Sequence, residues 1–175
     1  MHLVKRVVIV ISLLAGSGSV LVRGQSTDAQ LARLKQLFPS ATSFSPKGGE
    51  PPHIKAYGGP KSDTLVGYAF WTTEVSPLER GYGGPIVMLV GIDTKGILSG
   101  LIVAEHHEPY GDFSIDRPAF AAQFRGKDVR DPFKLGGDID AVSRATITMS
   151  SAVRAIRSSA RRMARELIAP PGTKP

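Results

Sequence analysis

The segment "DAVSRATITMSS", residues 140–151, gathers hydroxyl side chains and a positive charge just before the most helix-like part of the chain. Ser143, Thr146 and Thr148 carry hydroxyls, and Arg144 supplies the charge. A helix begins with unpaired N–H groups and the positive end of its dipole, and both favour a phosphate. The spacing therefore allows two interpretations, an ordinary N-cap or the attachment point of a phosphate-bearing ligand.

A second polar segment is "EHHE" at residues 105–108, which has the composition of a metal site. Neighbouring residues of an extended chain point to opposite faces, so only alternate members can converge. Glu105 could act with His107, or His106 with Glu108, and a metal would need further ligands from elsewhere. We therefore keep three interpretations: the polar end of a strand, the lining of a pocket, and a metal site.

A third segment, "GYGGPI" at residues 81–86, opens a predicted strand. Glycines around Tyr82 are typical of a turn. They would also let the backbone approach a planar ligand while the ring of Tyr82 covers it. The segment by itself leaves both interpretations open.

Other chemistries have less support in the sequence. There is no G-x-S-x-G motif of a serine hydrolase. No carboxylate cluster accompanies the hydroxyls, as a metal-dependent phosphate-handling enzyme would require. Arginines recur along one face of the last predicted helix, and they indicate either a solvated face or a surface for a membrane or an acidic partner. These arginines are Arg154, Arg157, Arg161 and Arg165.

The spacing of apolar residues predicts a sheet with helices before and after it. Helices are expected over 27–38, 118–127 and 148–168, and strands over 64–72, 85–93 and 96–107. The first helix should begin at a cap, Thr27 or Asp28, and Gly96 should take a positive φ in a hairpin turn. The fold class is α+β, an antiparallel or mixed β-sheet with flanking helices. Gly67, Gly91 and Gly100 lie within the strands and indicate bulges or close approach.

The N-terminus resembles an export signal. Lys5 and Arg6 precede an apolar run over 7–22, and small residues follow, with a candidate cleavage site after Gly24. Residues 1–24 are therefore expected to form a signal peptide or an uncleaved N-terminal anchor. Cleavage would lower the net charge from +7 to +4. That modest charge favours an anionic lipid, ligand or acidic protein over nucleic acid. With no cysteine in the chain, disulfides and thiolate metal sites are excluded.

Three segments in order resemble the FMN-binding domain family, which includes periplasmic subunits of sodium-pumping NADH:quinone oxidoreductases and the periplasmic domain of nitrous oxide reduction regulators. "DAVSRATIT" is similar to the family's flavin-attachment motif, "GYGGPIVMLVGIDTKGILSGLIV" to its paired strands, and "EHHEP" to the loop after them. The resemblance covers about residues 65–165. It implies an FMN-binding domain over 27–168. The Pro- and Gly-rich end of the chain is expected to be a disordered tail, 169–175.

The resemblance also implies the chemistry of the site. The family's acceptor is the threonine of the Ala-Thr pair, so Ala145 would precede the residue that carries FMN, Thr146, through a phosphodiester bond. The residues expected to hold the phosphate or to be recognised during attachment are Asp140, Ser143 and Thr148. Tyr82 is expected to cover the flavin ring, and His106 and Glu108 to make polar contacts with the ring or the ribityl chain.

The chain departs from the family pattern at Arg144, where glycine is common. A positive φ is costly for arginine, so we expect a different or a right-handed turn there. The chain also lacks the membrane helices and iron–sulfur segments of the long regulators, which favours a free-standing flavin domain.

The resemblance, together with the export signal, implies an exported, periplasmic electron-transfer protein rather than a stand-alone enzyme. Its partners would be an FMN transferase that uses FAD as donor and redox proteins, soluble or membrane-bound; no nucleic acid or metal is expected. The alternative is a cofactor-free extracytoplasmic binding module for an anionic ligand or an acidic protein.

Overall fold

The computed structural model describes residues 19–75 and 77–168. The chain divides into two compact units, Met1–Ala32 and Arg33–Pro175. Helix α1 (Ser19–Leu37) begins in the first unit, well before the expected start at Thr27 or Asp28, so the predicted cap is wrong. Most of the predicted signal segment and the tail, 169–175, lie outside the described residues. No helix in the described ranges is long and apolar enough to cross a membrane.

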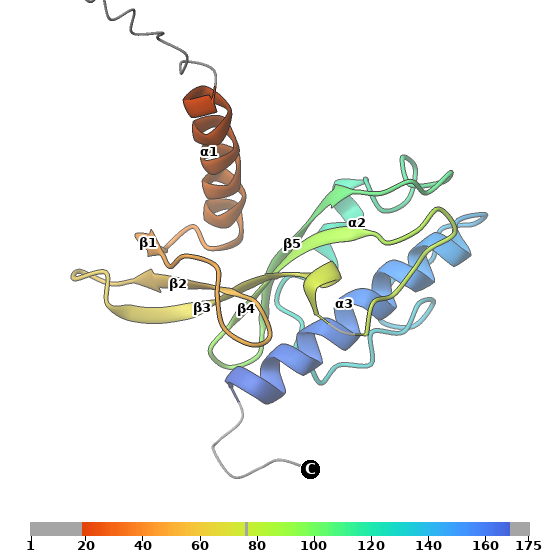
Figure 1. Ribbon diagram of the computed structural model, residues 1–175. Coiled ribbons are helices and arrows are strands. Elements are labelled where there is room, and N and C mark those ends of the chain that lie inside the picture. The colour runs from red at the N-terminus through yellow and green to blue at the C-terminus, as the bar shows by residue number, and fades with distance from the viewer. Residues whose placement is uncertain (1–18, 76, 169–175) are drawn as a thin grey trace, which may run out of the picture. The chain divides into compact units, whose positions relative to one another are not determined.

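The second unit is built on a five-stranded antiparallel sheet whose strands follow one another in chain order (Figure 1). The strands are β1 (Ser43–Phe44), β2 (Ile54–Gly58), β3 (Thr64–Trp71), β4 (Val87–Asp93) and β5 (Leu98–Glu105). A tight turn joins β4 to β5, and Gly96 takes the expected positive φ of 87° there. The α+β prediction is confirmed, and the sheet is purely antiparallel.

Strand β4, between β3 and β5, is buried on both faces, which explains its nearly continuous apolar sequence. Met88, Val90 and Ile92 belong to the core beneath helix α3 (Thr146–Leu167), and Leu89 belongs to the core on the opposite face. Helix α3 contributes the predicted stripe of side chains. Val153, Ile156, Ala160 and Met163 are buried, and Leu167 packs partly buried against them. Each large apolar side chain buried in this way contributes about 1.5–3 kcal/mol.

The last turn of α1 covers the opposite face of the sheet with Leu37, followed by Phe38. The ring of Phe38 lies where side chains would stand at two strand positions. A Cβ built on Gly67 would approach that ring to 2.6 Å, and one on Gly91 to 3.1 Å. Two of the strand glycines therefore make room for an aromatic ring. The third, Gly100, has a φ of 153° and lies beside a shift in the pairing register of β4 and β5.

Two short helical segments precede α3. A 3-10 helix, η1 (Thr72–Glu74), follows β3, and helix α2 (Pro118–Ala122) is shorter than the predicted 118–127. The chain after α2 continues in turns, because Phe124 and Arg125 donate their N–H groups three residues back, at 3.3 and 3.4 Å. This tighter winding is the 3-10 pattern common at helix ends.

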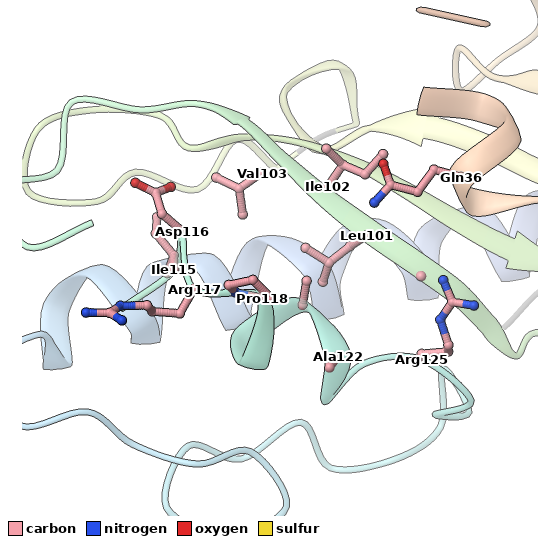
Figure 2. Close-up of a pocket in the computed structure, with 12 residues that line it drawn as sticks. Gln36, Leu101, Ile102, Val103, Ile115, Asp116, Arg117, Pro118, Ala122 and Arg125 are labelled. Atoms are coloured by element: carbon pink, nitrogen blue, oxygen red, sulfur yellow. The ribbon is translucent and has the colours of Figure 1, made fainter. Parts of the chain in front are cut away.

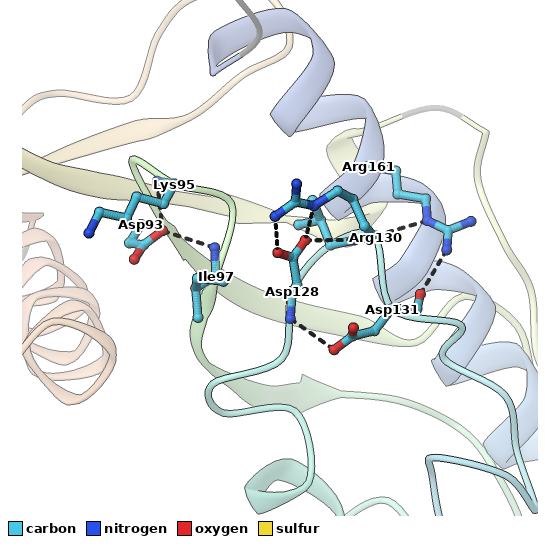
Figure 3. Close-up of polar contacts among 8 residues, drawn as sticks. Asp93, Lys95, Ile97, Asp128, Arg130, Asp131 and Arg161 are labelled. Atoms are coloured by element: carbon cyan, nitrogen blue, oxygen red, sulfur yellow. Dashed lines mark hydrogen bonds and ion pairs between the residues drawn. The ribbon is translucent and has the colours of Figure 1, made fainter.

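Hydrogen bonds join the loop between α2 and α3 to helix α3, and others form within the loop itself (Figure 3). Arg161 of α3 donates to the carbonyl oxygens of Val129 and Asp131, at 3.0 and 2.8 Å. Within the loop, hydrogen bonds from the side chain and backbone of Arg130 lower the pKa of Asp128 to about 2. Arg154 pairs with Glu79 at 3.1 Å. The predicted arginine face of α3 is therefore used in part to hold the fold together.

Candidate functional site

Glu108 joins three segments that are far apart in the sequence. Its carboxylate accepts a hydrogen bond from the Thr148 hydroxyl at 2.6 Å, in the first turn of α3. The other oxygen accepts one from the Gly83 N–H at 2.7 Å, in the loop before β4. The residue is 7% exposed. A single buried carboxylate thus positions the loop after β5, the loop before β4 and the beginning of α3.

The glycines of "GYGGPI" allow this close approach. A Cβ on Gly81 would lie 2.2 Å from a carboxylate oxygen of Glu108, and a Cβ on Gly83 would lie 1.9 Å from the backbone oxygen of His107. Neither position can carry a side chain without displacing the other loop. The two glycines therefore allow the loop after β5 to pack directly against their backbone. Tyr82, which lies between them, is on the surface and 75% exposed.

The carboxyl of Glu108 is held in its charged form. Burial favours the neutral acid and by itself would raise its pKa. The hydrogen bonds from Thr148, Gly83 and Tyr82, with the nearby His106, outweigh burial and leave the pKa below its ordinary value. Both carboxylate oxygens are thus engaged by the protein, so in this structure Glu108 organises the site.

His106 is fixed in one orientation beside Glu108. Its Nδ1 accepts the Glu108 N–H at 3.1 Å, so the neutral ring carries its proton on Nε2, which lies 2.9 Å from the carboxylate of Asp116. Gly111 leaves space for this ring, since a Cβ there would approach it to 2.0 Å. No group of three or more His, Cys, Asp or Glu in the described ranges is arranged to hold a metal ion.

Helix α3 begins at Thr146, two residues earlier than predicted. Its N-cap is Ala145, 1% exposed, and no side chain caps the helix. The N-cap interpretation of the hydroxyls is therefore wrong, and the first-turn N–H groups remain without an intrahelical partner. The expectation for Arg144 is wrong as well, because it adopts φ 71°, the left-handed region that the family's glycine would favour. Arg144 adopts this left-handed conformation at a cost of about 1–2 kcal/mol.

A cavity of about 490 Å³ opens at this helix end. Its lining residues are Tyr82, Pro109, Tyr110, Arg144, Thr146, Ile147 and Thr148. Three of them are large apolar or aromatic side chains with unusual exposure: Tyr82 at 75%, Ile147 at 62% and Tyr110 at 45%. Exposed apolar side chains gathered around a cavity of this size are typical of a ligand site. Tyr110 and Ile147 escaped the sequence analysis, although Tyr110 stands two residues after the "EHHE" segment.

The three candidate hydroxyls have different environments. Thr146 is exposed and lines the cavity, whereas Thr148 is 1% exposed and donates to Glu108. Ser143 is exposed but is not part of the cavity lining. Asp140 is exposed too, and its backbone N–H donates to the side chain of Gln123 at 2.6 Å.

An accessible hydroxyl at an uncapped helix N-terminus, beside an arginine and aromatic walls, defines a domain suited to a planar ligand with a phosphate. Comparison with known proteins agrees with this class. Residues 81–161 match the FMN-binding domain family. The chain is 31% identical over 143 residues to a subunit of the ion-translocating oxidoreductase complex of Methanosarcina acetivorans. That alignment includes 75% of this chain and 73% of the relative. The chain belongs to the FMN-binding domain family.

Two further relatives are matched over smaller shares of their length. The same-named oxidoreductase subunit from Erwinia tasmaniensis is 35% identical, with 63% of this chain and 55% of that protein aligned. The regulatory protein NosR of Stutzerimonas stutzeri is 27% identical, with 82% of this chain and 20% of NosR aligned. The chain thus spans only a fifth of the regulator and about half of the Erwinia protein.

Proposed function

We propose that this protein is an exported electron-transfer flavoprotein that carries FMN on Thr146 through a phosphodiester bond. The observation that carries the proposal is the environment of the hydroxyls. Of the candidates Ser143, Thr146 and Thr148, Thr146 alone is both exposed and part of the cavity lining. Thr148 also borders the cavity, but it is 1% exposed and its hydroxyl donates to Glu108.

The charges around Thr146 suit a phosphodiester. The first-turn N–H groups of α3 and the positive end of the helix dipole lie at the attachment point. Arg144 lines the same cavity, is exposed, and can pair with a phosphate oxygen. The negative charge of the nearby buried carboxylate of Glu108 is compensated in part by its hydrogen-bond donors on the protein.

The walls of the cavity suit the planar part of FMN. Tyr82 and Tyr110 present aromatic side chains, and Ile147 an aliphatic one, at 45–75% exposure. A flavin ring that covered them would remove apolar surface from water, which stabilises the bound arrangement by about 25 cal/mol per Å². His106 does not line this cavity; with Asp116 it borders a separate pocket, and its hydrogen bonds to Asp116 and to the Glu108 N–H hold the loop that carries Glu108. Bound FMN supplies the oxidation and reduction, and the protein's side chains set its surroundings.

Attachment requires a separate FMN transferase with FAD as donor. The bond from the Thr146 Oγ1 to the phosphorus of the FMN half forms, the bond between the two phosphates of FAD breaks, and AMP leaves. The hydroxyl proton passes to a base of the transferase. Covalent attachment is useful to a periplasmic protein, because FMN lost outside the cytoplasm is not readily replaced. The relatives named as subunits of ion-translocating oxidoreductase complexes support redox partner proteins at a membrane.

The test is an intact mass of the full chain, exported in a host that expresses an FMN transferase. We expect one FMN, less one water, on the wild-type chain and none on Thr146→Ala. Thr73→Ala, which removes a threonine hydroxyl outside the cavity lining, is the matched control that should keep the flavin. Thr146→Ala should fold normally, because its side chain is exposed. A flavin that persists on Thr146→Ala contradicts the assignment, and a wild-type chain without added mass favours the cofactor-free binding module.

A further inference from the structure

The outer edge of β5 is open along most of its length. In the sheet order, β5 is the last strand and β4 is its ladder partner. At its beginning, Leu98 exchanges backbone hydrogen bonds of 2.8 Å with Lys127 and Gly126. From Gly100 to Ala104, no described residue forms a backbone hydrogen bond to the strand on its outer side. An open edge of this kind is a template for one more strand.

A groove of about 370 Å³ follows this edge between β5, α2 and the loop that precedes α2. Leu101, Val103 and Ala121 line it with apolar atoms, so a strand laid in the groove could bury alternate side chains. Figure 2 shows Arg117 and Arg125 at opposite ends of the groove, with Pro118 between them. The groove therefore combines backbone donors and acceptors, an apolar floor and two terminal cations.

The two arginines are available to a partner. Both are exposed, and neither forms an ion pair with any of the described residues. The acid at the groove, Asp116, lies beside Arg117 and is within 2.9 Å of His106. This distribution favours an acidic occupant. A second copy of the chain would bring its own Arg117 and Arg125 into the same seam, which like-charge repulsion disfavours.

We propose that the outer edge of β5 binds an extended, acidic segment of a partner protein. The segment adds a strand beside residues 100–104 and places carboxylates against Arg117 and Arg125. The groove lining shares no residue with the cavity at Thr146, so the inference does not depend on the flavin.

The probe is a random peptide display library selected on the full chain, with and without flavin. We expect selected peptides to alternate β-branched residues with Asp or Glu. The double variant Arg117→Glu/Arg125→Glu should weaken their binding at least about tenfold, through loss of two ion pairs and gain of repulsion. The control Lys61→Glu/Lys134→Glu changes the net charge equally, at exposed lysines outside the groove, and should bind normally.

Hydrogen exchange supplies the second measurement. Bound peptide should slow amide exchange within residues 100–104, because the edge N–H groups gain partners. The proposal is overturned if the selected peptides lack acidic residues, if the double variant binds them as well as the wild type, or if protection appears elsewhere. Failure to select any arginine-dependent peptide also overturns it. Protection of 100–104 that depends on protein concentration without peptide would assign the edge to a second copy.

Discussion

Replacing Glu108 tests the contact that assembles the site. In Glu108→Ala, the Thr148 hydroxyl loses its acceptor while it stays buried, and the partly buried N–H of Gly83 loses its acceptor as well. Hydrogen bonds to a charged group contribute about 1.5–3 kcal/mol each, so we expect unfolding to become easier by about 3–5 kcal/mol. In Glu108→Gln, the amide can donate to the Thr148 oxygen and its carbonyl can still accept from Gly83. We expect a smaller loss, about 1–2 kcal/mol.

The lowered pKa of Glu108 determines how its contribution to stability changes with pH. The pKa of Glu108 is lower in the folded protein than its ordinary value of 4.5, so the unfolded chain binds the proton more tightly. The contribution of the charged carboxylate is therefore complete above pH 4.5 and is lost as the pH falls through the folded pKa. The difference in unfolding free energy between wild type and Glu108→Gln should be constant near neutral pH and should narrow below pH 4.5.

Urea unfolding followed by the fluorescence of Trp71, the single tryptophan, measures these differences. Glu166→Gln is the matched control, since Glu166 is exposed near the end of α3 and forms no hydrogen bond or ion pair with the described residues. It should change stability by no more than about 0.5 kcal/mol. The reasoning about Glu108 is refuted if Glu108→Gln is as stable as wild type at pH 7, or if the difference in their unfolding free energies does not change with pH.

Three further predictions concern the backbone and the loops. The free energy of unfolding of Arg144→Gly should exceed that of Arg144→Ala by about 1 kcal/mol, because only glycine adopts a φ of 71° without strain; equal free energies of unfolding would contradict this strain. Gly67→Ala should cost about 1–3 kcal/mol by forcing a Cβ to within 2.3 Å of the Ile92 carbonyl oxygen, whereas Gly48→Ala, with nothing within 4 Å, should be nearly neutral in the same assay. Asp128→Asn should lower the free energy of unfolding at neutral pH, because the pKa of Asp128 is lowered in the folded state. The difference from wild type should shrink as the pH falls from 3.8 through about 2; a difference that grows in acid would refute this.

Local sequence patterns were sufficient to establish the fold class, the major strands, the stripe of α3 and the family. Alternation of apolar residues reports strands, recurrence every three to four residues reports a helix, and a motif is read directly from the letters. In the "EHHE" segment, His106 and Glu108 are in contact, but through the backbone N–H of Glu108 and in a loop after β5 rather than as alternate side chains of a strand.

The accessibility of each hydroxyl and the role of Glu108 depend instead on tertiary contacts. Thr146 and Thr148 are the same residue type two positions apart, and no local pattern shows that the first is exposed at the cavity while the second is buried and donates to a carboxylate. The roles of Gly81 and Gly83 likewise depend on a loop more than twenty residues later in the chain. Even the strained turn at Arg144 is imposed from outside, because residues on both sides of it, Val142 and Ala145, pack into or against the core. Contacts between distant segments select among locally allowed conformations, and their free energy exceeds the small preferences that a short sequence expresses.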